Sequence, residues 1–418
     1  MRTRTIRRLL ASALLAAFSA AAAAEDCEAG IDCPGLSLGG SYTGDWRRNT
    51  AGGLQSGAAY SHLFTLGADW RVDSLFEEAQ LSGSASVMYI GGDGISARYV
   101  GDLQGINNIE ADTGWYLYEV WTEFGFGADA HTTLRAGVLD LNAEFDVPQT
   151  SGLFAASPFG VGTDLSQTGA AGPSIWPVTG LGIRAAGARD NGLAWRFGVY
   201  DGAPGNGGLH VSSDEGVIAI GELEYHSQRV NKMVLGAWGY SAAFERLDAA
   251  VVPDAASPSR GNRGWYALAD LPLGRVGDAR FDGALRLGTA SGQFNPVERY
   301  VGAAFTASDF WSNRPQDQLG LGVAWANLGK PYLDAQAFAG TPAAAAEICW
   351  ELTYVTHATP WLVLKPALQL VQHPGADAAL ADAWVVGLRF EVSQGESWRL
   401  SARRVVPDGD SVARNGQP

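Results

Sequence analysis

The polar residues that could bind a ligand gather in two irregular stretches of this chain. They are Arg98, Asp102, Gln104, Asn107, Asn108 and Glu110 in the first stretch, and Asn142, Glu144, Asp146, Asp164, Gln167 and Trp176 in the second. Arginine supplies a rigid fork of five donors, carboxylates accept hydrogen bonds, and tryptophan adds a flat apolar face. Such a set suits reversible recognition of a polar solute.

The second stretch lacks any regular pattern. Between Leu139 and Val178 no periodicity is sustained, and Gly, Pro, Ser, Asp and Asn are frequent. A segment of that length without regular structure is usually functional or disordered. Its content of Phe, Leu, Ile and Trp argues against disorder. We therefore predict a long loop packed inside the protein, most simply at the constriction of a pore.

Catalytic and metal-binding patterns are weak in this sequence. Glu119 and Glu123 would share one face of a strand and raise glycoside hydrolysis as an alternative, but a place on a polar wall explains them more simply. The Gly-rich piece 205–209 matches no nucleotide-binding pattern. The six histidines contain no H-x-x-x-H pair, so we expect neither a metal nor a cofactor.

Most of the chain alternates apolar and polar residues with a period of two, and almost none of it shows the helical period of 3.6. In one such run, Ile348, Trp350 and Leu352 alternate with Glu351 and Thr353. Sixteen runs of this kind are predicted to be strands. They span residues 36–44, 59–72, 78–91, 113–127, 131–139, 178–187, 192–200, 215–227, 230–242, 261–272, 279–289, 296–306, 316–326, 347–358, 361–371 and 382–393.

These strands fit a transmembrane barrel better than a soluble sandwich, although both architectures alternate. Their number is even, and their lengths suit a span of roughly 9–11 tilted residues. Short connections such as 127–129 and 188–191 alternate with longer ones, as barrels with periplasmic turns and extracellular loops require. Tryptophans near strand ends suit interfacial girdles; they are Trp70, Trp115, Trp195, Trp361 and Trp384. The predicted fold class is all-β, a transmembrane antiparallel β-barrel.

Parity along the strands predicts which side chains face the barrel lumen. A charge in mid-strand should face inward, because a lipid-facing Arg or Lys costs about 2–4 kcal/mol at the bilayer midplane. Tyr118 is predicted to face the opposite way from its charged neighbours. Both signs of charge occur on the predicted wall, which favours a neutral polar solute over a bare ion. The wall is predicted to contain Glu119, Trp121, Glu123, Arg135, Arg184, Arg196, Arg286, Lys365 and Arg389.

The N-terminus predicts export. Four arginines precede an apolar run and an Ala-x-Ala site, so residues 1–24 are expected to be a signal peptide and 25–35 a short periplasmic segment. Removing those arginines moves the formal charge from −15 to −19, which argues against a nucleic-acid partner. Cys27 and Cys33 could pair in an oxidising periplasm, whereas Cys349 is expected to be an inert small side chain.

Ten segments of the chain resemble the carbohydrate-selective outer-membrane porins of the OprB family. They are YTGDW (42–46), VGDLQGINNIEA (100–111), LYEVWTE (117–123), GVLDLNAEFD (137–146), LFAASPFGVGTDLSQTG (153–169), GPSIWPVTGLGIR (172–184), GVYDGAPG (198–205), LGLGVAWA (319–326), ELTYVTHATPW (351–361) and ALADAWVVGLRFEV (379–392). The resemblance covers residues 36–393 in order, which marks that span as the porin domain. Residues 394–418 are then a C-terminal extension of unknown role.

The resemblance implies a barrel of 16 strands in the outer membrane of a Gram-negative bacterium, with long extracellular loops folded into the lumen. It implies passive diffusion of glucose-like monosaccharides into the periplasm and no enzymatic activity. The partners expected are small sugars, outer-membrane lipid, the barrel-assembly machinery during biogenesis, and further copies of the chain in a homo-trimer. A general or anion-preferring porin is the first alternative, and a barrel-borne enzyme acting on glycans is the second.

A sugar channel needs weak sites that a solute can both enter and leave. The constriction is predicted to contain Arg98, Glu110, Glu144, Asp164 and Trp176. For each of these residues, bracing of a loop is the alternative role.

Overall fold

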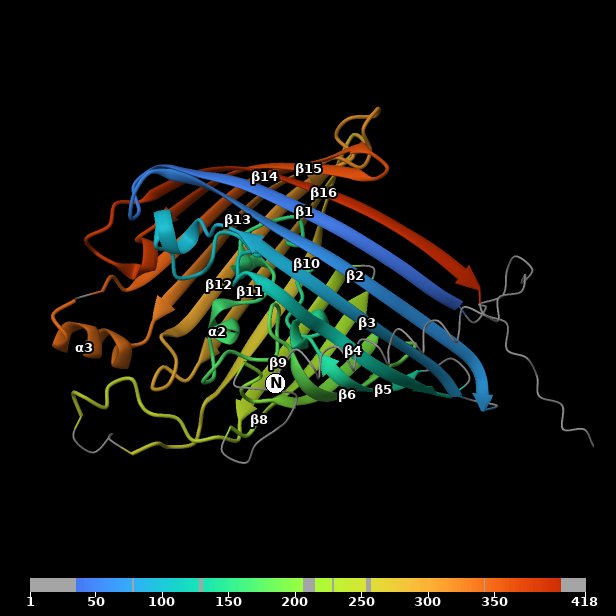
Figure 1. The fold of residues 1–418 in the computed structure, drawn as a ribbon, viewed down its shortest axis with the longest axis horizontal. Coiled ribbons are helices and arrows are strands. Elements are labelled where there is room, and N and C mark those ends of the chain that lie inside the picture. Colours follow the sequence, from blue (N-terminus) through green and yellow to red (C-terminus); the bar gives the residue numbers. More distant parts are fainter. Residues whose placement is uncertain are drawn as a thin grey trace, which may run out of the picture.

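A closed barrel forms the body of the molecule. The computed structural model describes residues 35–76, 79–127, 131–205, 215–227, 229–252, 257–341 and 343–399. Sixteen strands follow one another around the barrel in sequence order, each antiparallel to its neighbours, and β1 closes the barrel by pairing with β16 (Figure 1). Closure gives each described strand a neighbour on both sides, as a bilayer requires.

The strands match the predicted ones in number and order. They are β1 Gly35–Ala51, β2 Gly57–Phe76, β3 Ala79–Gly92, β4 Gly114–Phe126, β5 Thr132–Leu139, β6 Gly180–Ala188, β7 Leu193–Asp201, β8 Val217–Ser227, β9 Val230–Tyr240, β10 Arg263–Val276, β11 Ala279–Ala290, β12 Val297–Ser308, β13 Gln318–Leu328, β14 Ala346–Thr359, β15 Leu362–Gln372 and β16 Ala383–Arg399. The ends differ most in β1, which runs on to Ala51, and in β16, which continues past Ser393 to Arg399. Each extension pairs with the other strand's predicted part along the barrel closure: the end of β1 pairs with the start of β16, with Ala51 opposite Trp384, and the end of β16 pairs with the start of β1, with Arg399 opposite Gly35.

Short helical pieces interrupt the connections. They are the π-helix η1 Ser96–Val100, the 3-10 turns η2 Leu141–Ala143, η3 Ser157–Phe159 and η5 Pro374–Ala376, and the helices α2 Thr163–Ser166 and α3 Lys330–Phe338. The expectation of almost no helix is wrong at α3. This helix starts after Gly329 with a proline in its first turn and carries an ion pair of 2.6 Å between Lys330 and Asp334, one turn apart. Within the described residues, no helix has the length and apolar character needed to cross a membrane.

The two ends of the barrel differ in their connections. At the end where β1 begins and β16 stops, β10 and β11 are joined by only two residues, of which Gly277 has a φ of +61° that suits glycine. The long connections that follow β3, β5, β9 and β13, at residues 93, 140, 241 and 329, all begin at the other end. Because short turns mark the periplasmic side of bacterial barrels, the long connections are on the extracellular side.

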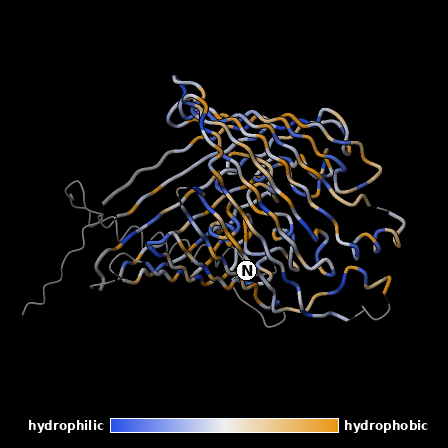
Figure 2. Tube along the Cα trace, turned by 180° about the vertical axis from the view of Figure 1, so that it is seen from behind, coloured by the Kyte–Doolittle hydropathy of each residue, from blue (hydrophilic) through white to orange (hydrophobic). Residues whose placement is uncertain are grey.

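Alternation sorts the strand residues between lipid and lumen. In β14, Trp350 and Leu352 are exposed on the outside, while Glu351 and Thr353 are fully buried inside. Hydrophobic and hydrophilic residues interleave along the strands in the same way around the barrel (Figure 2). In β14 the charged side chain thus lies on the inward face and the large apolar ones on the outer face.

Strand β4 departs from this parity at one point. The register with β3 pairs Glu119 with Ser86 and Leu117 with Val87, so Tyr118 is left unpaired in a β-bulge. Its hydroxyl donates a hydrogen bond of 2.5 Å to Asp140, which begins the longest inward connection. The prediction that Tyr118 faces away from the lumen is wrong, because the extra residue turns the side chain back inside.

Candidate functional site: the channel interior

Two connections fold into the barrel and fill much of its extracellular half. We call residues 93–113 the short inward loop and residues 140–179 the long inward loop; α2 of the long loop lies inside the ring of strands in Figure 1. Apolar side chains of both loops pack against the inner wall in two buried clusters. Burying each large apolar side chain stabilises the packed loop by about 1.5–3 kcal/mol.

Strand β13 shows how the wall makes room for the long inward loop. Its inward positions are small, with Gly320 and Gly322 followed by two buried alanines. A methyl group at Gly322 would lie 2.7 Å from the ring of Phe159, and one at Gly320 would lie 2.6 Å from Leu153. The alternation in the segment LGLGVAWA thus has a physical reason. Its large residues face the lipid, and its glycines leave space for the loop inside the barrel.

Buried carboxylates on β14 hold the backbones of both inward loops. Glu351 accepts hydrogen bonds of 2.8 Å from the backbone N–H groups of Ala155 and Ala156 in the long loop. Glu347 accepts bonds of 2.7 and 2.9 Å from the N–H groups of Leu103 and Gln104 in the short loop. Irregular backbone inside a barrel must find partners for its N–H groups, and a carboxylate makes these bonds strong.

Two further wall carboxylates hold the tip of the long inward loop. Asp270 on β10 accepts bonds of 3.0 and 2.8 Å from the N–H groups of Gln149 and Thr150. Glu222 on β8 accepts a bond of 2.8 Å from the N–H group of Asp146. We call Glu222, Asp270, Glu347 and Glu351 the wall clamps.

A buried arginine connects the centre of the long loop to β11. Arg286 donates from Nε to Asp146 at 2.9 Å and from a terminal nitrogen to the carboxylate of Asp164. Its guanidinium also lies over the rings of Tyr266 and Tyr300, at 5.3 and 4.8 Å. Burial raises the pKa of Asp164 above its ordinary range, although Arg286 acts against that shift.

A second charged cluster lies where β4, β5 and β6 meet the long loop. Arg135 contacts Glu123 at 3.0 Å and Glu144 at 2.9 Å, and Arg184 binds the same two carboxylates. The guanidinium of Arg135 stacks 3.7 Å above the ring of Trp121. Arg184 is buried, whereas Arg135, Glu123 and Glu144 are partly exposed, so the cluster combines bracing of the loop with exposure to the lumen.

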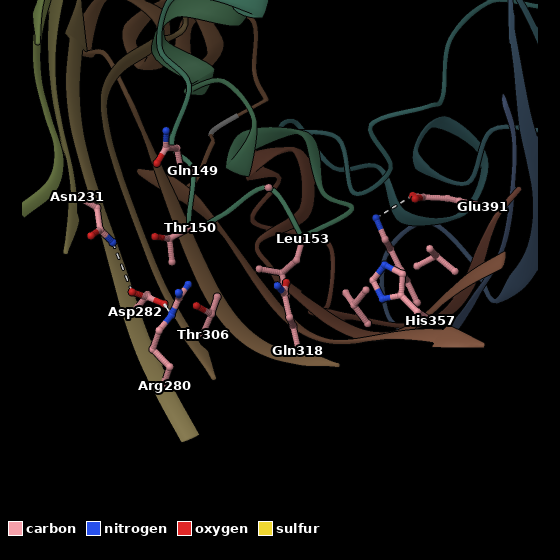
Figure 3. A pocket seen from close by; sticks show the side chains of 14 residues that line it. Gln149, Thr150, Leu153, Asn231, Arg280, Asp282, Thr306, Gln318, His357 and Glu391 are labelled. Atoms are coloured by element: carbon pink, nitrogen blue, oxygen red, sulfur yellow. Dashed lines mark hydrogen bonds and ion pairs between the residues drawn. The ribbon is translucent and has the colours of Figure 1, made fainter. Parts of the chain in front are cut away.

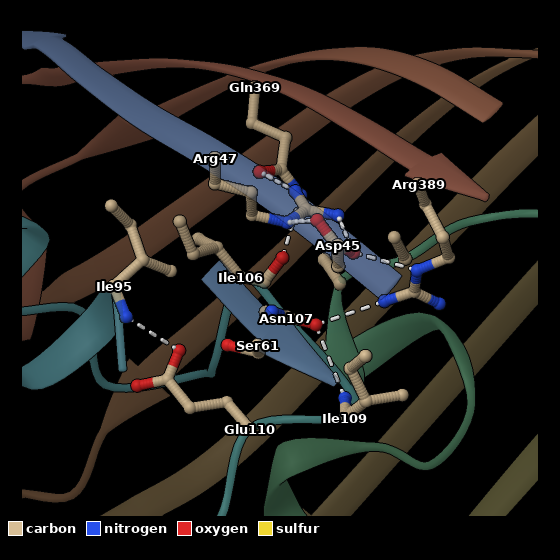
Figure 4. A network of polar contacts seen from close by, with 12 residues as sticks. Asp45, Arg47, Ser61, Ile95, Ile106, Asn107, Ile109, Glu110, Gln369 and Arg389 are labelled. Carbon is tan, nitrogen blue, oxygen red and sulfur yellow. Dashed lines mark hydrogen bonds and ion pairs between the residues drawn. The ribbon is translucent and has the colours of Figure 1, made fainter. Parts of the chain in front are cut away.

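A third network ties the short inward loop to the closure of the barrel (Figure 4). Asp45 on β1 bonds Arg47 at 2.9 Å and Arg389 on β16 at 2.7 Å. Arg389 also donates to the side chain of Asn107 at 2.9 Å, and Arg47 donates to Gln369 on β15. The loop is thus fixed to three neighbouring strands.

Below the inward loops, on the periplasmic side, the lumen opens into a cavity of about 390 Å³ that we call the vestibule (Figure 3). Ion pairs of 2.8 Å lie on its wall between Arg280 and Asp282 on β11 and between Lys365 and Glu391 on β15 and β16. The tip of the long loop covers the vestibule. Its lining consists of Gln149, Thr150, Gly152, Leu153, Asn231, Arg280, Asp282, Thr306, Gln318, Val355, His357, Val363, Lys365 and Glu391.

A family model described as the carbohydrate-selective porin family OprB matches residues 55–393. The chain belongs to this family. Porin B of Pseudomonas aeruginosa is 26% identical over 150 residues, which are 32% of this chain and 33% of that protein. The chain thus spans about a third of the length of the curated relative that it matches.

Solved porins share the fold. The high-pH structure of Pseudomonas putida OprB superimposes with a TM-score of 0.75 at 19% identity, over 86% of this chain and 94% of that chain. A mutant of Rh. blastica porin does so with a TM-score of 0.53 at 10% identity, over 86% of this chain and all of the other. The family and the barrel together make this chain an outer-membrane protein of a Gram-negative bacterium.

The five residues predicted for the constriction occupy separate places in this porin. Arg98 on η1 is exposed and pairs with Asp93 at 2.7 Å. Glu110 accepts bonds from the N–H groups that begin η1, at 2.9 Å from Ile95, and burial raises its pKa. Within the described residues the five share no hydrogen bond or ion pair with one another; Glu144 and Asp164 lie in the two clusters described above.

Trp176 is half-buried near the end of the long inward loop, and its backbone N–H group bonds Asp140 at the start of the same loop. The predicted wall residues also have partners. Glu119 accepts a bond of 3.0 Å from the N–H group of Asp140, and Arg196 pairs with Glu222 at 3.0 Å and Glu224 at 2.6 Å.

The wall clamps and most of the vestibule lining were not among the predicted site residues. Parity put Glu351 on the inward side but could not say what it meets, because its loop partners are far away in sequence, at 195 and 196 positions. The sequence offered one indication of Asp45 and Arg47: Asp45 lies in YTGDW, a segment that resembles the family, and Arg47 follows that segment directly.

Proposed function

We propose that this chain is an outer-membrane porin through which glucose-like monosaccharides diffuse passively into the periplasm. One observation carries the proposal: the long inward loop is clamped across a closed barrel, so a solute must pass through an interior narrowed by fixed backbone. A rigid, narrowed lumen selects solutes by size and by hydrogen bonding.

Paired charges support a neutral solute. The partly exposed arginines of the lumen, Arg135 and Arg196, have carboxylate partners, and so do Arg280 and Lys365 in the vestibule. Pairing leaves little net field to attract a bare ion. The same groups still offer donors and acceptors to the hydroxyl groups of a sugar.

We also propose that the protein is a channel and not an enzyme. The two carboxylates that suggested glycoside hydrolysis both have structural partners. Glu119 accepts a hydrogen bond from the backbone N–H group of Asp140, and Glu123 pairs with Arg135 and Arg184. Assembly as a homo-trimer and contact with the barrel-assembly machinery stay predictions.

The test is single-channel conductance in planar bilayers, titrated with glucose and, separately, with phosphate. The proposal predicts that glucose lowers the ionic current in a concentration-dependent way and that phosphate does not. Block by phosphate, or strong anion selectivity without any effect of glucose, would support the anion-preferring alternative. Refolding into the barrel is checked first by heat-modifiable migration in a detergent gel.

A further inference from the structure

The vestibule carries hydrogen-bonding groups that have no partner in the described part of the chain. The side chains of Thr306, Gln318 and His357 form no hydrogen bond or ion pair there. Arg280 uses only its Nε toward Asp282, which leaves both terminal NH₂ groups, and Lys365 has one partner for three donor positions. These groups surround one cavity (Figure 3), so a ligand there could satisfy several of them together.

The same cavity has an apolar patch beside its polar rim. Leu153 of the long inward loop and Val355 of β14 belong to a buried apolar cluster, and Val363 of β15 packs against that cluster. All three side chains also line the vestibule. A ligand that fits must therefore present an apolar face to this patch and polar groups to the rim.

Charge and size narrow the class of ligand. The two ion pairs are Arg280–Asp282 and Lys365–Glu391, so positive and negative groups are balanced on the wall. This favours a neutral molecule with many hydroxyl groups, which can both donate to carboxylates and accept from cations. A volume of about 390 Å³ falls at the small end of ligand sites, which span about 300–1,000 Å³.

From these features we infer that the vestibule is a separate sugar-binding site on the periplasmic side of the constriction. It holds one pyranose, with the C–H face of the ring on Leu153, Val355 and Val363 and the hydroxyl groups toward the two ion pairs. This inference rests on the proposed function, because it assumes that sugars enter the lumen. The site lies on the periplasmic side of the inward loops, so a sugar that enters from the periplasm reaches this site before it reaches the loops.

The experiment measures glucose-induced current noise with glucose on one side of the bilayer at a time. The test variant is Arg280→Gln combined with Lys365→Gln. We expect its apparent affinity for glucose added from the periplasmic side to fall about tenfold, since each lost bond to a charged group is a strong one. Binding of glucose added from the extracellular side should change less than about twofold, because the inward loops are unaltered.

A matched control makes the same change of charge outside the lumen. It combines Arg246→Gln with Lys330→Gln, both on extracellular connections, and should bind glucose from either side as the unaltered porin does. Equal periplasmic-side affinity in the test variant and the unaltered porin would overturn the inference.

A second variant removes one exposed rim group without touching an ion pair. Gln318→Leu should weaken periplasmic-side binding about threefold even if the double variant folds poorly; unchanged binding in this variant would also count against the site. If the unaltered porin responds to phosphate and not to glucose from either side, the proposed function itself fails. That result is distinct from a porin that responds to glucose on the extracellular side alone, which would reject the vestibule site and leave the function standing.

Discussion

Two glutamates inside this barrel show how one residue type takes two roles. Glu351 on β14 is fully buried and accepts bonds from two backbone N–H groups of the long inward loop, from Gln369 and from Thr353. Among the described residues, Glu391 on β16 pairs only with Lys365, and its side chain is 32% exposed. Both point inward on regular strands. The difference is whether a loop lies over the residue.

The comparison extends to the two halves of the lumen. Around the inward loops, wall carboxylates and arginines are satisfied by loop backbone or by one another. In the vestibule, side chains of the same chemical types keep free donors and acceptors. A buried polar group without a partner is costly, whereas one that faces water is not. The clamped half is therefore built for rigidity, and the vestibule is available for binding.

The largest effect should come from breaking the most buried charge cluster. Arg286→Leu leaves Asp146 and Asp164 without their cation, and we expect the free energy of unfolding to fall by about 3–5 kcal/mol. Urea-induced unfolding in lipid vesicles measures this. The matched change in the vestibule, Lys365→Leu, should cost far less, because Glu391 is partly exposed. Equal losses would remove the distinction between the two halves.

A methyl group added to the barrel wall should lower the stability of the protein where a loop packs against the wall and leave it unchanged elsewhere. Gly322→Ala forces the rings of Phe159 and Phe154 to shift, and we expect a loss of about 1–3 kcal/mol in the free energy of unfolding. At Gly39 on β1 a methyl group would meet nothing within 4 Å, so Gly39→Ala should show no loss. A neutral result at Gly322 would mean that the loop does not pack there.

Titration of Glu110 tests whether the short inward loop is packed as described. Burial raises the pKa of Glu110 above its ordinary value of 4.5, and the N–H groups of Ile95 and Ser96 lower it in part. The folded state thus binds the proton more tightly than the unfolded chain does. The stabilisation from this proton is complete below the unfolded pKa and is lost as the pH rises through the folded pKa.

Glu110→Gln lacks this titration, so the stability of the unaltered porin relative to the variant should decline as the pH rises through and above 4.5, the ordinary pKa of this group. Unfolding curves collected from below to above that pH provide the measurement. Parallel pH profiles for the two proteins would show that Glu110 is not held in a buried site.

The smallest effect is expected at Arg98. Its ion pair with Asp93 joins two exposed side chains, and such pairs contribute about 0–1 kcal/mol. Arg98→Ala should leave the unfolding midpoint in urea unchanged within error. A loss comparable to that of Arg286→Leu would show that the short inward loop depends on this contact.

The sequence was sufficient for the strands, because alternation with a period of two is a local signal; the choice of a barrel also needed the even number of strands, the tryptophans near strand ends and the family resemblance. It gave the number and order of the strands and the inward direction of residues such as Arg184, Arg389 and Glu351. It failed where a local exception decides the outcome: at Tyr118, where a bulge reverses the parity, and at α3, where a short helix has no apolar stripe to reveal it.

The interior was less accessible from the sequence because contacts there join distant residues. Asp270 meets Gln149 across 121 positions, and Arg286 meets Asp146 across 140. Parity can say that Asp270 or Arg286 points inward, but only the folded loops decide which inward residues are clamped and which stay open. That division is what separates loop-bracing groups from ligand-binding ones.

The most direct test of that division is the single-channel conductance of Glu351→Gln beside that of Glu391→Gln. In Glu351→Gln, an NH₂ group replaces one of the two carboxylate oxygens that accept hydrogen bonds from the loop N–H groups. The long inward loop should therefore loosen, and the open-channel conductance should rise. Glu391→Gln should leave conductance near that of the unaltered porin. If the two variants conduct alike, or if Glu351→Gln conducts as the unaltered porin does, the wall clamps do not set the width of this channel.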